Sequence, residues 1–291
     1  MSRSFRHFVA PVAGAVGGCA GWLTVSRSFR RLVAPVALGV LAVLPGAPPL
    51  GAAPVAVRFR EGTTRGFLVV RAASGEVIGR GDLGQKPVGE QIASRLVLTF
   101  DDGSVRDEAT TYSQRGVFRL EAYRLVQRGP SLPAAEVAFD RQSGRYQSRL
   151  RERPDAREET AEGALEMPDD LYNGMAAVLL KNLPAGEPAT VRLAAFTPAA
   201  RILAMHVRAE GEDRPLLAGR PLVTTRYLLK LEIGGLAGLV APIVGKAPPD
   251  LRYWLVPGDP PGFVRFEGAM YLNGPVWRVE MAGPQWPAAS R

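Results

Sequence analysis

The side chains that could carry acid–base or metal chemistry are few in this sequence of 291 residues. The sequence has two histidines, and of these only His206 lies outside the first 53 residues. One histidine cannot form a histidine cluster around a metal, and in a strand it would share a face with Arg208. A lone histidine of this kind is typical of a structural or exposed residue, so it predicts no catalytic site.

Carboxylate pairs are the other possible source of hydrolytic chemistry. Asp101–Asp102 precedes Gly103, as in a turn, and Asp169–Asp170 suits the first turn of a helix. Asp107 and Glu108 are adjacent, so in a strand they point to opposite faces. Each carboxylate pair therefore has a structural explanation, and none of them predicts a hydrolase.

Nucleophile and phosphate-binding motifs are also missing from the sequence. It has no Gly-x-Ser-x-Gly motif. Around Gly245-Lys246 a phosphate loop would need Gly in place of Val240 and Ser or Thr in place of Ala247. The one cysteine, Cys19, lies near the N-terminus, which leaves the rest of the chain without thiol, Cys–metal or disulfide chemistry. We therefore predict no enzyme activity, no metal and no cofactor.

The N-terminal segment has the organisation of an export signal. Residues 26–31 are basic, residues 32–44 are apolar, and a stretch of small residues and prolines ends at Ala53. The apolar stretch is short for a bilayer, which takes about 20 residues. The sequence therefore predicts an exported and periplasmic protein.

This leader is nearly duplicated, because residues 2–13 recur with few changes as residues 26–37. We expect residues 1–53 to form one duplicated leader or signal segment. Two alternatives remain for its processing. It could stay uncleaved as an N-terminal membrane anchor, or it could be acylated at Cys19 as in a lipoprotein.

The charge of the chain is concentrated in the same segment. The formal net charge is +8, and the leader contributes five arginines and no acid, so residues 54–291 carry only +3. Their arginines are scattered singly among acids. Nucleic-acid binding needs basic residues gathered on one face. The sequence therefore predicts that nucleic acid is not a partner.

Beyond the leader the dominant pattern is an alternation of apolar and polar residues, typical of half-buried strands. Short turns rich in Gly, Pro and Asp separate the strands, which favours antiparallel pairing. We expect residues 54–291 to form one mainly β domain, a curved antiparallel sheet or an unclosed β-barrel. The later predicted strands are 104–115, 116–128, 134–140, 145–151, 189–196, 201–210, 222–233, 250–256, 263–271 and 276–282.

Two segments interrupt the alternation. Residues 168–182 place apolar side chains at helical spacing and predict a helix packed on the sheet. Residues 234–246 are almost uncharged and predict a short apolar helix or loop. It could plug an open end of the barrel, or it could close a cavity for an apolar ligand. The candidate lining residues of that cavity are Val240, Ile243, Trp254 and Phe266.

Several stretches resemble an uncharacterised family of exported bacterial β-rich proteins, a domain of unknown function. They are residues 173–182, 230–238, 264–268 and 274–280. The layout is also distantly similar to the half-open barrels of periplasmic lipoprotein carriers. The resemblance implies a β-rich exported domain, and it brings no site residues with it.

The function predicted from these features is non-catalytic. The first hypothesis is an envelope protein that binds or shuttles an apolar or amphiphilic molecule, such as a lipid. The alternative is a structural or interaction module that binds another envelope protein. An enzyme of unrecognised type is the third. A carrier needs an accessible apolar interior, an interaction module needs an exposed edge or patch, and an enzyme needs polar groups that converge in a cleft, including His206.

Overall fold

The computed structural model describes residues 52–217, 219–232 and 250–282, which all belong to one compact unit. The predicted segment 234–246, with Val240 and Ile243, lies outside the described residues. The fold is mainly β, with a fourteen-stranded antiparallel sheet, a separate two-stranded hairpin and one helix. The predicted class, an antiparallel sheet that does not close into a barrel, is confirmed.

Neighbouring strands of the sheet are mostly consecutive in the sequence, with one jump where the first strand meets the last. Its strand order is β8-β7-β6-β5-β4-β3-β2-β1-β16-β15-β14-β13-β10-β9, so β1 pairs with the last strand, β16. The first eight strands are β1 (Thr64–Arg71), β2 (Val77–Val88), β3 (Gln91–Phe100), β4 (Val105–Arg115), β5 (Val117–Arg128), β6 (Ala134–Asp140), β7 (Arg145–Arg151) and β8 (Glu159–Ala164). The others are β9 (Ala189–Phe196), β10 (Ala200–Asp213), β13 (Thr224–Glu232), β14 (Leu251–Val256), β15 (Gly262–Ala269) and β16 (Val276–Met281).

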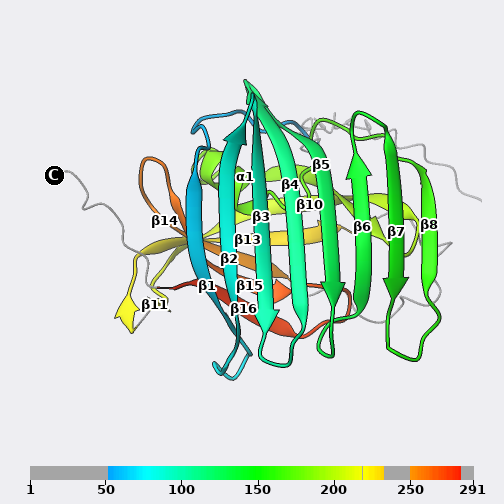
Figure 1. The fold of residues 1–291 in the computed structure, drawn as a ribbon. Coiled ribbons are helices and arrows are strands. Elements are labelled where there is room, and N and C mark those ends of the chain that lie inside the picture. The colour runs from blue at the N-terminus through cyan, green and yellow to red at the C-terminus, as the bar shows by residue number, and fades with distance from the viewer. Residues whose placement is uncertain (1–51, 218, 233–249, 283–291) are drawn as a thin grey trace, which may run out of the picture. The chain divides into compact units, whose positions relative to one another are not determined.

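The sheet bends so that its two halves face each other (Figure 1). We call strands β1–β8 the front half and strands β9, β10 and β13–β16 the back half. In the view of Figure 1 the front strands run side by side and cross in front of the back strands. The surfaces that the two halves turn toward each other are the inner face, and the opposite surfaces are the outer face.

The main core lies between the two halves. Tyr123 on β5 stacks on its cross-strand neighbour Phe139, with ring centroids 5.1 Å apart. Phe139 in turn contacts Phe196 on β9, 5.8 Å away, which joins the front half to the back half. The helix α1 (Ala176–Asn182) adds its buried residues to the same core. Burial of this apolar surface is the principal term that holds the two halves together.

Side chains of β7, the neighbour of the edge strand β8, contact the opposite end of the sheet at β9 and the turn that follows it. Tyr146 on β7 packs on Phe196, and the Ser148 hydroxyl donates a hydrogen bond of 2.7 Å to the Pro198 carbonyl. Within the described residues these contacts take the place of a strand ladder. The front and back edges are therefore held near each other without closing the barrel.

The helix is shorter than the sequence predicts. It was expected over 168–182 but begins at Ala176, because the chain just before it pairs with the outer edge of β9. Leu171 bridges Arg192 in parallel, and the Arg192 N–H donates to the Asp170 carbonyl. Backbone pairing at a sheet edge thus replaces the first turns of the predicted helix.

The hairpin of β11 (Leu216–Leu217) and β12 (Arg220–Pro221) folds over the outer face of the back half. Its Leu217 belongs to a small buried cluster with Trp254 and Val264. The Arg265 side chain donates a hydrogen bond to the Leu216 carbonyl, which ties the hairpin to β15. This part of the outer face is therefore covered.

Candidate functional site

An ion pair lies on the inner face of the front half. Register places Leu83, Leu96, Glu108 and Leu125 side by side on β2, β3, β4 and β5, so a carboxylate interrupts an apolar row. Arg106 lies two residues before Glu108 on the same face, and a nitrogen of its guanidinium is 3.5 Å from Glu108 Oε2. Their side chains are only 12% and 14% exposed. Charged groups are rarely so buried unless they are paired.

Hydrogen bonds fix both members of this pair. The Tyr123 hydroxyl donates to Glu108 Oε1 over 2.6 Å. Arg106 donates to Gln127 Oε1 over 2.6 Å and to the Met270 carbonyl, in the turn between β15 and β16, over 3.2 Å. The last bond brings the back half into contact with the pair. The orientation of the charged groups is therefore set by both halves of the sheet.

An aromatic row on the back half lies on the opposite wall. Register places Tyr227, Tyr253, Phe266 and Val279 side by side across β13–β16. The rings of Tyr253 and Phe266 are 5.0 Å apart. Burial is the main cause that raises the pKa of Tyr253, and the charge of Glu108 adds to it, so the phenol keeps its proton. The aromatic row therefore lies within electrostatic range of the buried pair.

The side chains of and around these two rows pack against the core but are not all fully buried. Several inward-pointing side chains stay partly exposed although they lie between the two halves. They are Leu83, Leu96, Leu125, Tyr227, Tyr253 and Phe266. They give the region between the two halves apolar and aromatic walls that are only partly buried. We call this the inner site, and Arg106, Glu108 and Tyr123 are its polar residues.

The two described lining candidates from the sequence lie apart. Phe266 belongs to the inner site, where its ring packs at a tilt against that of Tyr253. Trp254 pairs with Arg265, the neighbour of Phe266, so the Trp254 and Phe266 side chains point to opposite faces of the sheet. Trp254 is buried under the β11–β12 hairpin, and its Nε1 donates to Asp213 Oδ2 over 2.8 Å. The structure therefore does not bring these two rings together.

Sequence reasoning missed the charged pair of the inner site. It placed Asp107 and Glu108 on opposite faces, and in the structure Asp107 does point outward, where it pairs with Arg95 over 2.6 Å. The available signal was Tyr112, a buried aromatic residue on the same strand. Alternation counted back from Tyr112 places Thr110, Glu108 and Arg106 on the inner face.

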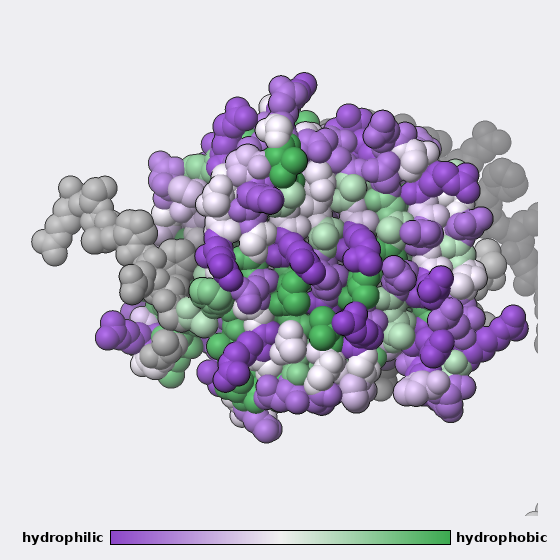
Figure 2. All heavy atoms as spheres, viewed as in Figure 1, coloured by the Kyte–Doolittle hydropathy of each residue, from purple (hydrophilic) through white to green (hydrophobic). Residues whose placement is uncertain are grey.

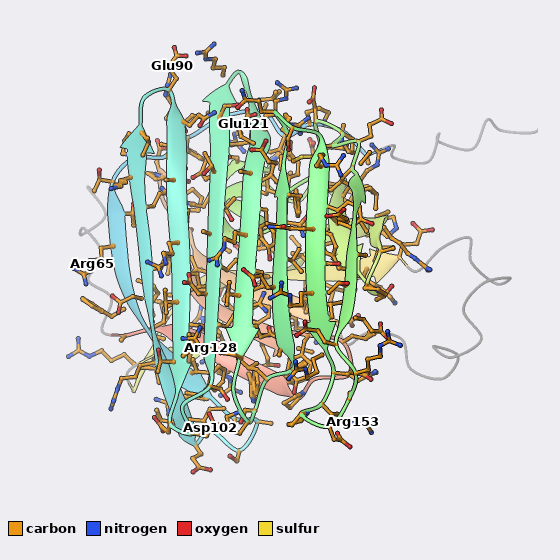
Figure 3. All side chains as sticks on the ribbon, turned by 45° about the vertical axis from the view of Figure 1, so that its right-hand side comes forward. Arg65, Glu90, Asp102, Glu121, Arg128 and Arg153 are labelled. Carbon is orange, nitrogen blue, oxygen red and sulfur yellow. The ribbon has the colours of Figure 1, made fainter. Side chains whose placement is uncertain are left out.

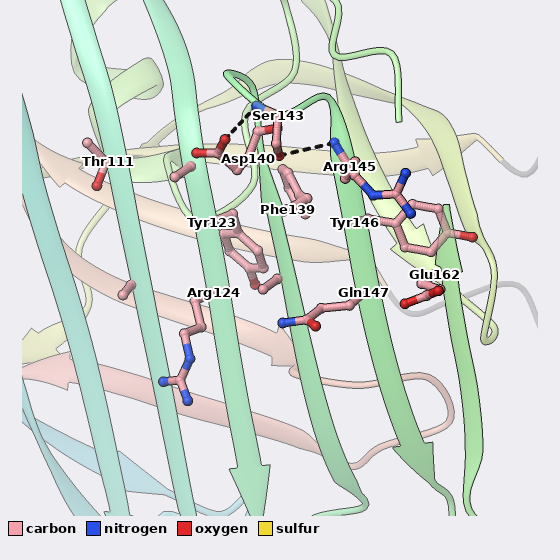
Figure 4. Close-up of a pocket in the computed structure, with 13 residues that line it drawn as sticks. Thr111, Tyr123, Arg124, Phe139, Asp140, Ser143, Arg145, Tyr146, Gln147 and Glu162 are labelled. Carbon is pink, nitrogen blue, oxygen red and sulfur yellow. Dashed lines mark hydrogen bonds between the residues drawn. The ribbon is translucent and has the colours of Figure 1, made fainter. Parts of the chain in front are cut away.

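The outer face of the front half is charged and carries a groove. Figure 2 shows this face, with hydrophilic side chains around smaller apolar areas. The side chains labelled in Figure 3, such as Arg65, Arg128 and Arg153, stand at its margins. A groove of about 420 Å³ crosses β4–β8, where register sets Arg124, Ala138 and Gln147 side by side (Figure 4). Small side chains on neighbouring strands expose the backbone and make this groove shallow.

Among the described residues, no three His, Cys, Asp or Glu side chains are grouped as a metal site would need. No helix in the described part of the chain is both long and apolar enough to cross a bilayer.

Comparison with known proteins gives a single structural neighbour to report. No family model matches the chain, and no curated protein matches it. Among solved structures, the chain is similar to a β-barrel-like protein of the domain of unknown function DUF1849 from Brucella abortus. The two share 12% sequence identity with a TM-score of 0.39, over 77% of this chain and 97% of that chain. That neighbour is described as β-barrel-like and of unknown function.

Proposed function

We propose that this protein binds an amphiphilic molecule in the inner site, as an exported, periplasmic carrier or binding protein. The observation that carries the proposal is the lining of the inner site, which combines apolar and aromatic side chains with one buried ion pair. Partly exposed apolar and aromatic side chains would accept a hydrocarbon chain, and Arg106 with Glu108 would face its polar end.

The polar residues of the inner site carry no net charge, and this affects which amphiphiles could bind there. Arg106 and Glu108 neutralise each other, and both are already hydrogen-bonded. A ligand with a long apolar chain gains about 0.8 kcal/mol for each CH₂ group that it buries. Affinity would therefore come mainly from the chain, and the polar residues would orient the ligand. The proposal thus includes lipids and other single-chain amphiphiles.

The interaction-module alternative depends on the exposed edge of the sheet. Strand β8 pairs only with β7 among the described strands, so its outer edge could accept another strand. However, Glu159 and Glu162 are exposed on this strand. Charges on an edge strand oppose strand addition. The carrier hypothesis is therefore favoured.

A matched pair of variants tests the proposal. Leu96 points into the inner site, whereas the next residue, Val97, points to the outer face, and both are partly exposed. Leu96→Trp should fill the inner site, while Val97→Trp adds the same ring outside it. The probe is a dansyl-labelled undecanoic acid, whose fluorescence rises and shifts to the blue in an apolar site. Thermal unfolding of each variant verifies that it is folded.

We expect the native protein to bind the probe and L96W to weaken binding by about tenfold or more, equivalent to about 1.4 kcal/mol. V97W should stay within about twofold of the native protein. Equal binding by folded L96W, or no binding by the native protein, would contradict the proposal.

A further inference from the structure

The outer face of the back half carries a group of polar residues that the inner site does not use. Register places Thr190 on β9, His206 on β10 and Lys230 on β13 directly side by side. They point outward, because the next residue after His206, Val207, is buried in the core. Glu232 lies two residues beyond Lys230 and therefore shares its face. Three neighbouring strands thus bring these side chains together.

Hydrogen bonds link three of them in a chain. His206 Nε2 is 2.8 Å from Glu232 Oε2, and His206 Nδ1 is 3.1 Å from Thr190 Oγ1. An ionised carboxylate can only accept hydrogen bonds, so in the neutral imidazole the proton lies on Nε2. This assignment leaves the Nδ1 lone pair facing the Thr190 hydroxyl. A hydroxyl, a base and a carboxylate that orients the base are the parts of an activated nucleophile.

The chain of hydrogen bonds opens into a cavity of about 480 Å³, which Thr190, His206 and Lys230 help to line. Two other charged lining residues are already paired, Arg208 with Glu210 and Asp250 with Arg252. Lys230 is exposed and lies directly beside His206 on the neighbouring strand. Its ammonium group is therefore available to an oxygen that gains negative charge next to Thr190.

We infer that Thr190, His206 and Glu232 form an acyl-transfer site whose substrates are activated esters. Thr190 Oγ1 attacks the ester carbonyl carbon while His206 Nδ1 takes the hydroxyl proton, and Glu232 stabilises the resulting imidazolium. The bond from the carbonyl carbon to the leaving oxygen then breaks, and His206 returns the proton to the departing alcohol. Water hydrolyses the acyl-threonine by the same route, which releases the carboxylic acid and restores Thr190.

This site is independent of the proposed carrier function. It lies on the outer face, whereas the amphiphile would bind on the inner face. The His206 and Glu232 side chains are 51% and 54% exposed, so the core does not depend on either of them. Substitutions here should therefore leave the fold intact, with stability within about 0.5 kcal/mol of the native value.

The experiment uses 4-nitrophenyl acetate with the purified protein. It records the release of 4-nitrophenolate, and peptide mass spectrometry locates the acetyl group. The variants are Thr190→Ala, Thr190→Ser, His206→Gln and Glu232→Gln. Thr160→Ala, at an exposed threonine on strand β8, is the matched control. Thermal unfolding verifies that each variant is folded.

We expect an acetyl group on Thr190 and nitrophenolate release above the buffer rate. T190A and H206Q should lower this excess rate by about 100-fold, in the range typical of general base catalysis, and E232Q by about tenfold. T190S should retain activity, and T160A should match the native protein. An exposed imidazole can itself cleave this ester without Thr190. A folded T190A that matches the native rate, or a native rate equal to the buffer rate, would overturn the inference.

Discussion

The Tyr123 hydroxyl donates a 2.6 Å hydrogen bond to Glu108 on the inner face of the sheet. Burial, and after it the negative charge of Glu108, raises the pKa of Tyr123 far above its usual range. The tyrosine therefore stays protonated and remains a donor. Glu108 lies in a row of apolar side chains, and two contacts stabilise its carboxylate there. One is the hydrogen bond from Tyr123, and the other is the ion pair with Arg106.

We predict that Tyr123→Phe destabilises the protein because it leaves Glu108 Oε1 without its donor. The free energy of unfolding should fall by about 1–3 kcal/mol. The matched control is Tyr146→Phe, since Tyr146 also packs on the inner face. Y146F should change the stability by less than about 0.5 kcal/mol. Urea unfolding of both variants measures the difference, and equal losses would show that the Tyr123–Glu108 bond does not matter.

The Trp254–Asp213 contact predicts a pH-dependent effect on stability. The hydrogen bond from the Trp254 indole is the main cause that lowers the pKa of Asp213. Because the carboxyl pKa is lower in the folded than in the unfolded state, the ionised group stabilises the fold above about pH 4. This stabilisation disappears as the pH falls through the folded pKa. Asp213 is partly exposed, so we expect a contribution of only about 1 kcal/mol.

Trp254→Phe should therefore lower stability at neutral pH, and part of its deficit should vanish below about pH 4. Trp277→Phe is the control, because Trp277 packs on Phe100 in a different cluster, away from Asp213. Its deficit should stay constant with pH. Urea unfolding from pH 3 to pH 7 distinguishes the two, and a pH-independent deficit for W254F would refute the assignment.

Gly174 lies in a turn that fits tightly against the inner site. Its φ is +71°, and a Cβ there would overlap Thr110 Oγ1 and approach Tyr123. Gly186 has a similar φ of +78° but open space around it. Gly174→Ala should therefore cost at least about 1 kcal/mol more than Gly186→Ala, since both share the backbone strain and only one has the overlap. Equal melting temperatures for the two variants would contradict this prediction.

Much of the fold could be predicted from the sequence because strand alternation and turn residues are local signals. The predicted strand at 145–151 coincides with β7, and the Asp101-Asp102-Gly103 turn forms with Gly103 at φ +84°. Strand β2 was not predicted, since its glycines and charged residues hide the alternation. Gly79 and Gly81 are required there because a Cβ would meet β3 at under 3 Å.

The start of the helix and the polar groups on the sheet were harder to predict, because both depend on contacts between distant parts of the chain. The start of α1 depends on the pairing of Leu171 with Arg192, which no local pattern indicates. The Thr190–His206–Glu232 chain depends on the register of three strands. Sequence reasoning could place His206 on a strand, but it could not identify its neighbours.

Native mass spectrometry of the protein purified without detergent shows whether the inner site holds an amphiphile. We expect a reproducible added mass that organic solvent removes. This mass should be present in V97W and lost or much reduced in L96W. A bare protein mass in the native chain, unchanged after incubation with the dansyl-labelled acid, would contradict the account.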